Sequence, residues 1–315
     1  MNLEKAQKVR NQIAAFLQVD DVLRRGLGAP RVAIGIAPSD TVMFKIAIRA
    51  PSQKDLDRAL GDGASQEVTD MADDEVDIRV TGEVVVDPPS IPGTGRALAI
   101  GASVGHYRCT AGTLGFFAQR LSDGAAGFVS NNHVIADCDQ GKSGDDILSP
   151  APIDHGDRSK DTVAHLVAGY PLLQKNGTVV DAAFALLRDG VPYDASDIGG
   201  SIRLQPLLVP LFKQRKVLKF GRSTGITYGR ITAFALQNLD VDYPALKTRI
   251  QFDRQIEISS DGDQPFSRPG DSGSLVVNPE GHPIGLLFSG TRDGKYAYAN
   301  PIADVMRELD VRLIP

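Results

Sequence analysis

A serine held between glycines, directly before an apolar run, constrains this chain more than any other feature. Residues 268–274 read Arg-Pro-Gly-Asp-Ser-Gly-Ser, and Leu275-Val276-Val277 follow. Gly270 allows a backbone geometry that a Cβ would obstruct, so the turn can present the Ser272 hydroxyl to a cleft. The same turn can aim the N–H groups of Gly270 and Ser272 at one point, as an oxyanion requires. A Gly-rich hairpin turn is the alternative, and a catalytic interpretation needs a histidine base and a carboxylate elsewhere in the chain.

One histidine and one aspartate have settings that suit those roles. His133 follows the segment Phe128-Val129-Ser130-Asn131-Asn132, and Asp181 lies within the apolar stretch 179–187. A carboxylate in apolar surroundings is costly unless hydrogen bonds satisfy it, and the Nδ1–H group of His133 would do so. Asp137 and Asp161 are rival acids, but their surroundings are more polar, so Asp181 is preferred.

The order of the three groups along the chain distinguishes between the known classes of serine hydrolase. His133, Asp181 and Ser272 follow one another with separations of 48 and 91 residues. That order is the one found in chymotrypsin-type proteases, whereas subtilisins and α/β-hydrolases order the groups differently. An α/β-hydrolase is excluded because His282 is the one histidine after Ser272, and it is too close to leave room for an intervening acid strand.

The first 95 residues predict a small α+β module and a linker. Apolar spacing of three or four predicts a helix over 3–17, and turn residues separate strands at 31–36 and 42–49. A helix over 52–60 begins at the N-cap residue Ser52, and alternation predicts a strand over 76–86. We interpret this module as a docking or oligomerisation unit, with a regulatory cover over the active site as the alternative. Crowded Pro and Gly then mark a linker, which ends near residue 95.

The remainder of the chain, residues 96–315, predicts a β-rich domain. Short strands between Gly-rich turns occupy about 100–195 and again about 205–300, which is typical of closed barrels or sandwiches. A helix over about 301–310 opens with Pro301. Since Ser272 lies in the second half and His133 and Asp181 lie in the first, the cleft is expected between two barrels.

Composition and charge limit the cellular compartments and the kinds of partner that we expect for this protein. A net charge of −5 gives no basic excess for nucleic acid, and no apolar run reaches membrane-spanning length. The first ten residues lack the apolar core of a signal peptide, and two cysteines suit a reducing compartment, so we expect a cytoplasmic protein. Cys109 and Cys138 flank His133, and a bridge between them is the less favoured alternative to free thiols. His155 between Asp154 and Asp157 has no further ligand at helpful spacing, so neither a metal nor a cofactor is expected.

Three motifs together carry a resemblance to a known family. Ser130-Asn131-Asn132-His133, Val180-Asp181-Ala182-Ala183 and Gly270-Asp271-Ser272-Gly273-Ser274 resemble the triad motifs of chymotrypsin/trypsin-like serine peptidases. Further segments are similar to the Narrow Leaf-type trypsin-like peptidases of plants and their bacterial relatives. They are 110–115, 221–225, 285–290 and 298–302.

The resemblance implies two six-stranded antiparallel β-barrels and peptide-bond hydrolysis through an acyl-enzyme. It makes Ser272 the nucleophile, His133 the base, Asp181 the orienting acid, and the N–H groups of Gly270 and Ser272 the oxyanion hole. The substrate would be a protein or peptide. The alternatives are an inactive or assembly-switched binding protein on the protease fold, and an esterase or acyltransferase that uses the same groups.

Three departures from digestive relatives bear on the site. Those enzymes pair the Asp before the serine with a newly cut N-terminus, but no matching start occurs here, so Asp271 needs another partner or the site is switched by assembly. Their substrate-binding strand carries Ser-Trp-Gly, and matching the glycine to Gly290 places Phe288 and Ser289 at the first two positions. Phe266 stands where trypsin carries its specificity aspartate. The expected pocket residues are therefore Phe266, Phe288, Ser289 and Gly290, with an apolar or small preference.

Overall fold

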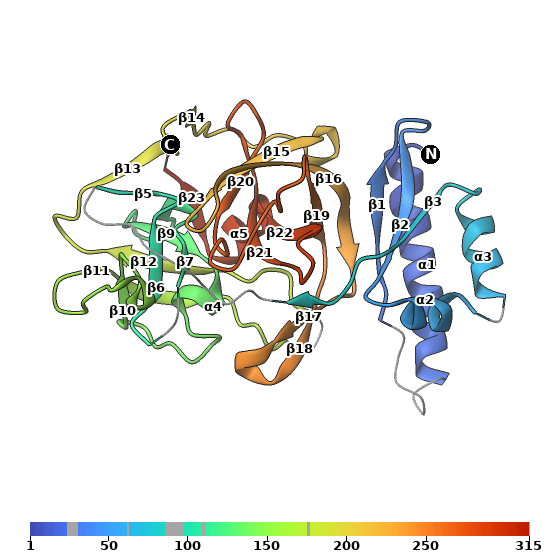
Figure 1. The fold of residues 1–315 in the computed structure, drawn as a ribbon, viewed down its shortest axis with the longest axis horizontal. Helices are drawn as coiled ribbons and strands as arrows, with labels where there is room; N and C mark the ends of the chain where they lie inside the picture. Colours follow the sequence, from blue (N-terminus) through green and yellow to red (C-terminus); the bar gives the residue numbers. More distant parts are fainter. Residues whose placement is uncertain (24–30, 62, 86–96, 109–110, 175–176, 315) are drawn as a thin grey trace.

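Three layers of structure lie along the long axis of the molecule (Figure 1). The computed structural model describes residues 1–23, 31–61, 63–85, 97–108, 111–174 and 177–314. The N-terminal helices and strands form one end, a closed β-barrel lies in the middle, and a second curled sheet forms the other end. The mainly β double-barrel class that the sequence predicts is confirmed.

The N-terminal part is a three-stranded sheet covered by helices. Its elements are α1 (Leu3–Leu23), β1 (Ala33–Pro38), β2 (Phe44–Ala50), α2 (Gln53–Leu60), α3 (Ala64–Met71) and β3 (Val76–Val80). Helix α1 packs on β1 and β2 through the buried residues Ala6, Val9, Ile13 and Leu17. Ser52 caps α2 as predicted, because its side chain accepts a hydrogen bond from the Asp55 N–H group.

Two details of the N-terminal part differ from the sequence prediction. Helix α3 was not predicted, because its polar sequence Ala-Ser-Gln-Glu-Val-Thr-Asp-Met shows little apolar periodicity. The strand predicted over 76–86 is two strands, β3 and β4 (Val84–Val85), because Gly82 has a φ of +87° between them.

The first half of the β-rich region is a curled eight-stranded sheet with a small three-stranded sheet beside it. The larger sheet has the order β23-β8-β9-β12-β11-β10-β6-β7, and the smaller one has the order β14-β13-β5. Their strands are β5 (Leu98–Ile100), β6 (Ser103–His106), β7 (Gly112–Thr113), β8 (Phe116–Arg120), β9 (Ala126–Ser130), β10 (Asp146–Leu148), β11 (Thr162–Gly169), β12 (Ala183–Leu187), β13 (Tyr193–Ile198), β14 (Ile202–Arg203) and β23 (Val311–Leu313).

The second half of the β-rich region contains a closed ring of six antiparallel strands. Pairing runs β15-β16-β19-β22-β21-β20 and returns to β15. These strands are β15 (Lys216–Gly221), β16 (Gly225–Gln237), β19 (Gln255–Ser260), β20 (Leu275–Val277), β21 (Pro283–Thr291) and β22 (Tyr296–Pro301). A hairpin of β17 (Leu239–Tyr243) and β18 (Thr248–Phe252) extends from the ring.

Short helices complete the fold. They are α4 (Asn132–Ile135), α5 (Ile302–Glu308), and the 3₁₀ turns η1 (Pro152–Asp154), η2 (Leu211–Lys213) and η3 (Pro244–Leu246). None of the helices in the described ranges combines the length and the apolarity that a membrane crossing needs.

The N-terminal sheet and the closed barrel are continuous through one long strand. Strand β16 has 13 residues and pairs with β15 and β19 in the barrel and with β1 in the N-terminal sheet. Buried apolar side chains from both parts form a single cluster, which includes Ile34 and Ile46 together with Ile231 and Ile258. The N-terminal part therefore packs on the barrel as an extension of its sheet and core.

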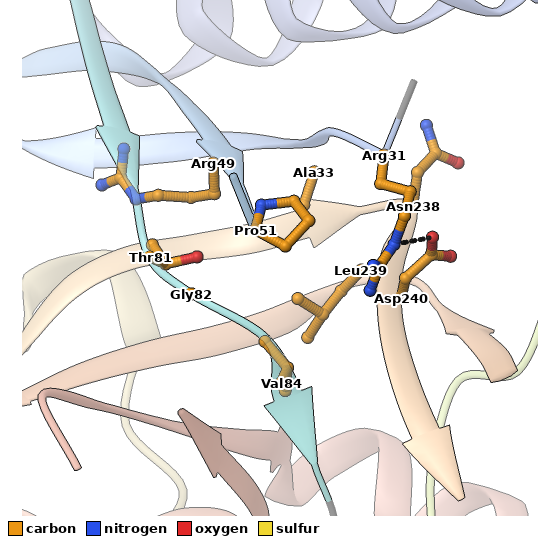
Figure 2. Close-up of a pocket in the computed structure, with 10 residues that line it drawn as sticks. All are labelled: Arg31, Ala33, Arg49, Pro51, Thr81, Gly82, Val84, Asn238, Leu239 and Asp240. Atoms are coloured by element: carbon orange, nitrogen blue, oxygen red, sulfur yellow. Dashed lines mark hydrogen bonds and ion pairs between the residues drawn. The ribbon is translucent and has the colours of Figure 1, made fainter. Parts of the chain in front are cut away.

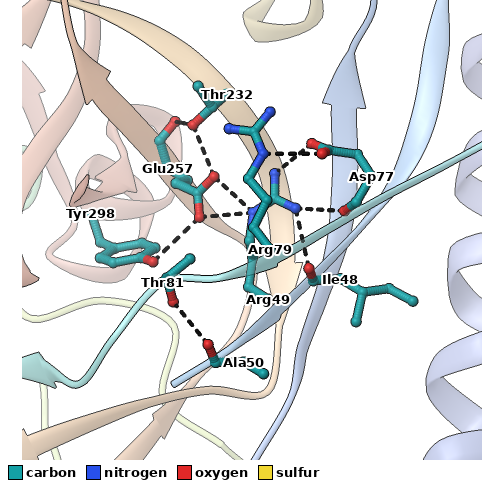
Figure 3. A network of polar contacts seen from close by, with 9 residues as sticks. All are labelled: Ile48, Arg49, Ala50, Asp77, Arg79, Thr81, Thr232, Glu257 and Tyr298. Carbon is teal, nitrogen blue, oxygen red and sulfur yellow. Dashed lines mark hydrogen bonds and ion pairs between the residues drawn. The ribbon is translucent and has the colours of Figure 1, made fainter. Parts of the chain in front are cut away.

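A buried ion network crosses the same junction (Figure 3). The Arg49 guanidinium on β2 contacts the Glu257 carboxylate on β19 at 2.9 Å and the Asp77 carboxylate on β3 at 2.8 Å. Thr232 and Tyr298 also donate hydrogen bonds to Glu257, at 2.8 and 3.3 Å. Since the side chains of Arg49 and Glu257 are 1% and 0% exposed, each charge depends on its partner.

Strand β4 links the N-terminal part to the region of the expected active site. In the sheet it lies between β17 and β21, pairing Val85 with Asp242 and with Gly290. A small pocket lies beside this strand, and Figure 2 shows Val84 and Leu239 in its wall. Arg31 spans the same region, because its guanidinium contacts the carboxylates of Glu83 and Asp240.

Replacing Arg49 with methionine tests the buried network. We expect the free energy of unfolding to fall by about 3–5 kcal/mol, because the substitution leaves the Glu257 carboxylate buried without its cation. Urea denaturation followed by circular dichroism would measure the loss. The double variant Arg49→Met, Glu257→Met should recover most of it, and Arg79→Met, at a half-exposed partner of Asp77, should cost below about 1 kcal/mol. Equal losses in Arg49→Met and Arg79→Met would contradict the prediction.

Candidate active site

Strand pairing in the first half brings His133 and Asp181 to the same edge. Strand β9 ends at Ser130 and pairs there with Ala183, the first residue of β12. His133 lies three residues after the end of β9, and Asp181 lies two residues before the start of β12. The two strands are antiparallel, so both side chains leave the sheet at one end.

The Asp181 carboxylate is fully buried and holds the histidine by two contacts. Its Oδ2 atom lies 2.5 Å from His133 Nδ1, and its Oδ1 atom accepts the His133 main-chain N–H at 3.2 Å. The Tyr243 hydroxyl donates a further hydrogen bond to Oδ2 at 2.6 Å. Main-chain groups of Asp181 bind the side chains of Asn131 and Asn300. The carboxylate therefore fixes the imidazole so that Nδ1 is directed inward.

The serine turn, which comprises residues 268–274, is anchored to the first half through Thr113 of β7. The Thr113 N–H donates to the Ser272 carbonyl at 2.7 Å, and its hydroxyl donates to the Gly270 carbonyl at 2.8 Å. The Thr113 carbonyl accepts the Ser130 hydroxyl at 2.8 Å. Gly273 has a φ of +94°, and a Cβ there would lie 2.2 Å from the Thr113 carbonyl oxygen, so this position requires glycine. Ser272 thus sits beside the segment that leads into His133.

The remaining polar atoms of His133 and Ser272 are not bonded to each other. His133 Nε2 is buried and has no hydrogen-bond partner among the described residues. The Ser272 hydroxyl lies 3.5 Å from the Phe288 carbonyl oxygen. Catalytic hydrogen bonds are often long or poorly aligned in the absence of substrate, so this geometry is compatible with a base and a nucleophile at rest.

Two N–H groups of the serine turn have no main-chain acceptor in the described structure. The N–H groups of Asp271, Gly273 and Ser274 donate to main-chain carbonyls, whereas no such bond is present for Gly270 or Ser272. Gly270 adopts a φ of +95°, the left-handed geometry expected of it. These are the two donors that the sequence assigns to an oxyanion hole, and that role stays a prediction.

Asp271 has a partner inside the chain. Lys219 Nζ on β15 lies 3.0 Å from Asp271 Oδ2, and both side chains are 0% exposed. The same carboxylate accepts hydrogen bonds from the N–H groups of Ser223, Thr224 and Arg268, at 2.9, 3.2 and 3.0 Å. A lysine ammonium therefore faces the aspartate, which supplies the other partner that the sequence analysis required for Asp271. Burial lowers the pKa of Lys219, and the charge of Asp271 opposes that effect.

The four residues expected to form the substrate pocket lie near the serine turn in different ways. The side chains of Phe266 and Phe288 are buried in apolar clusters, where Phe288 packs on Phe252 with ring centroids 4.8 Å apart. The Ser289 hydroxyl is buried without a partner in the described structure. Gly290 pairs with Val85 of β4. Their assignment to a pocket stays a prediction.

Other side chains that the sequence singled out take part in separate contacts. Asp137 forms an ion pair with Arg108, and Asp161 accepts the Asp157 N–H, so neither rival acid is placed at His133. Asp154 is bound to Arg222, which occupies the carboxylate considered with His155 as a metal ligand.

Of the two cysteines, Cys138 lies among the described residues. Cys138 is buried, and burial raises the pKa of its thiol to about 12, so the thiolate is scarce at neutral pH. Cys109 lies outside the described residues, so the question of a bridge stays open.

One family profile and one plant protein match parts of this chain. The profile described as the Nal1 C-terminal domain matches residues 196–299, which contain Ser272 but not His133 or Asp181. The rice protein NARROW LEAF 1 (Oryza sativa subsp. japonica) is 27% identical over 225 residues, which cover 63% of this chain and 37% of that protein. The match thus spans a little over a third of the relative's length.

The structural neighbours are chymotrypsin/trypsin-like serine proteases. Thermobifida fusca protease A is 15% identical with a TM-score of 0.48, and the match covers 70% of this chain and 99% of that one. Cellulomonas bogoriensis chymotrypsin is 19% identical with a TM-score of 0.46, covering 69% and 98%. A glutamic acid-specific serine protease is 16% identical with a TM-score of 0.49, covering 69% and 100%.

Replacing Lys219 with methionine tests the partner of Asp271. We expect faster amide hydrogen exchange over 222–225 and 268–274, because a carboxylate without its cation no longer holds the surrounding N–H groups in place. Exchange measured by mass spectrometry would locate the change. The control is Arg230→Met at the exposed Arg230–Asp261 pair on the same barrel. Unchanged exchange over 268–274 in Lys219→Met would contradict the prediction.

Proposed function

We propose that this protein is a serine endopeptidase that hydrolyses peptide bonds of a protein substrate through an acyl-enzyme. Ser272 is the nucleophile, His133 is the general base and then the general acid, and Asp181 orients His133. The observation that carries the proposal is the 2.5 Å contact between His133 Nδ1 and Asp181 Oδ2. It leaves Nε2 of the same ring without a hydrogen-bond partner among the described residues.

The proposed chemistry follows from the protonation states that these contacts favour. A buried carboxylate holds the Nδ1–H tautomer, so Nε2 can accept the Ser272 proton as Oγ attacks the scissile carbonyl carbon. The N–H groups of Gly270 and Ser272 stabilise the resulting oxyanion. His133 then donates the proton to the leaving amine, and a water molecule deacylates Ser272 by the same route.

The Lys219–Asp271 pair supports a site that needs no proteolytic activation. In the proposed mechanism the Asp271 carboxylate sets the turn that carries both oxyanion donors, and its cation belongs to the same folded chain. We therefore propose that the oxyanion hole is formed on folding. A switch by assembly through the N-terminal module is the competing possibility, and oligomerisation through that module stays a proposal.

The edge of β21 beside Ser272 is the place where a substrate backbone would pair. Extended peptides add to unpaired sheet edges by main-chain hydrogen bonds. Along this edge the serine turn bonds to Leu287, and β4 pairs at Gly290 and Thr291. Phe288 and Ser289 lie between these two pairings. We propose that the substrate backbone pairs there, with its N-terminal side directed toward β4.

A binding protein built on the protease fold is the second candidate. The observation that favours it is the absence of a hydrogen bond between His133 Nε2 and Ser272 Oγ in the described structure. An esterase or acyltransferase would use the same three groups with a different acceptor. We further propose a cytoplasmic location, because the sequence carries only two cysteines. The boundary near residue 95 between module and peptidase domain likewise stays a proposal.

Labelling with a fluorophosphonate probe tests the proposed function. We expect covalent modification of wild-type Ser272, located by mass spectrometry, because a serine activated by a base attacks phosphorus. Ser272→Ala should abolish the adduct, and Ser274→Ala serves as the matched control, because Ser274 lies in the same turn and its hydroxyl donates to the Asp271 carbonyl. His133→Ala should slow labelling by at least about 100-fold. A folded wild-type protein that is not labelled would favour the binding protein.

A length series of peptide substrates tests the proposed position of the backbone. Peptides with one, two and four residues before the scissile bond should show kcat/KM rising about fivefold from one to two, as expected for one added hydrogen bond. The step from two to four should stay within about twofold, because Gly290 already pairs with Val85. A tenfold rise between two and four residues would show that β4 does not limit the site.

A further inference from the structure

Tyr243 is the side chain from the second half that reaches the Asp181 carboxylate. Its hydroxyl lies 2.6 Å from Asp181 Oδ2, the same oxygen that faces His133 Nδ1. The tyrosine is at the end of β17 and is 1% exposed, and Asp181 is fully buried. One carboxylate oxygen therefore takes two hydrogen bonds, one from the imidazole and one from the phenol.

The direction of the phenol hydrogen bond is fixed by its surroundings. Burial, together with the neighbouring charge of Asp181, raises the pKa of Tyr243 well above its ordinary value, so the phenol stays protonated. An ionised carboxylate accepts hydrogen bonds and cannot donate them. The Tyr243 hydroxyl therefore donates its proton to Oδ2 and draws off part of the negative charge that faces the imidazole.

Aromatic packing holds the tyrosine ring in place. It stacks on Phe252 of β18, with centroids 6.1 Å apart and an interplanar angle of 20°. Its edge meets the His133 ring at 6.2 Å and 80°, and Phe252 in turn packs on Phe288. A phenyl ring has no polar hydrogen, so Phe288 cannot donate a side-chain hydrogen bond to Asp181.

We propose that Tyr243 is a positioning residue for the His133–Asp181 pair. Its hydroxyl fixes Oδ2 in line with Nδ1, and by sharing the carboxylate charge it sets how tightly His133 holds a proton. This inference deepens the proposed function and rests on it. The role assigned to Tyr243 is to keep His133 neutral, and therefore able to act as a base, over a wider range of pH.

Other charged groups near the pair bear on the same titration. The loop after His133 carries Asp137, Cys138 and Asp139, and the buried thiol of Cys138 faces the Asp181 charge. Asp139 is engaged by Asn132 and by the Leu172 N–H. On the hairpin that carries Tyr243, Asp242 is paired with Arg249 at 2.9 Å. Substitution of the phenol oxygen alone leaves all of these groups unchanged.

The test replaces Tyr243 with phenylalanine and follows His133 itself. We expect the titration midpoint of the His133 imidazole, measured by NMR, to rise by about one pH unit, because a carboxylate that loses a donor stabilises the imidazolium more strongly. The rate at which a fluorophosphonate labels Ser272 at neutral pH should fall by up to about tenfold, the limit that a one-unit rise of the midpoint sets. The acid limb of the labelling rate should move to higher pH by the same amount as the NMR midpoint.

Tyr298 offers a matched control. It is likewise a wholly buried tyrosine of the second half, and its hydroxyl donates to a different carboxylate, that of Glu257, at 3.3 Å. Tyr298→Phe removes the same atom and should leave both the His133 midpoint and the labelling rate unchanged. Incorporating 3-fluorotyrosine at position 243 supplies a second variant of nearly native shape. Its more acidic hydroxyl is a stronger donor, so the His133 midpoint should fall.

The outcomes separate this inference from the proposed function. If Tyr243→Phe is folded and its His133 midpoint matches wild type, the inference is wrong. If Tyr243→Phe does not fold, a fluorotyrosine variant with an unshifted midpoint overturns it instead. If the midpoint shifts as expected but wild-type Ser272 is never labelled, the phenol sets the basicity of His133 and the proposed peptidase function fails.

Discussion

Buried carboxylates set the relative positions of the parts of this protein. Asp181 meets His133 of its own half and Tyr243 of the other half. Glu257 in the closed barrel meets Arg49 from the N-terminal sheet. An ionised group away from water must find its partners or lose several kcal/mol, so each carboxylate requires that two parts of the chain dock in one way. The apolar clusters supply most of the favourable burial, and these charges make the docking specific.

The sequence predicted the turn that carries Ser272 because the residues that determine its backbone geometry are adjacent in the chain. The glycines around Ser272 adopt the positive φ values that only such residues tolerate well. The closeness of His133 and Asp181 follows from one antiparallel pairing between strands whose sequences are both apolar. The mainly β class was readable from short strands and turns for the same reason.

The remaining features depend on contacts distant in sequence. Lys219 lies within the apolar run Val217-Leu218-Lys219-Phe220, and a lysine in such a run signals a buried partner, but nothing in the run identifies Asp271. Tyr243 was missed because its strand, β17, is short and alternates with aspartates at 240 and 242. The position of β4 between β17 and β21 could not be predicted from the sequence. Its two valines resemble the end of any other strand and do not identify the strands with which they pair.

The ammonium of Lys219 has a consequence for how such a protein is controlled. The cation that faces Asp271 belongs to a side chain, so it is in place once the chain has folded. No cleavage by a processing enzyme is needed to supply it. Under the proposed function, formation of this ion pair requires no cleavage of the chain. Control of the proposed proteolysis then depends on substrate selectivity. Under the proposed function, the short stretch of β21 between the serine turn and β4 accepts only a substrate backbone that can reach it in extended form.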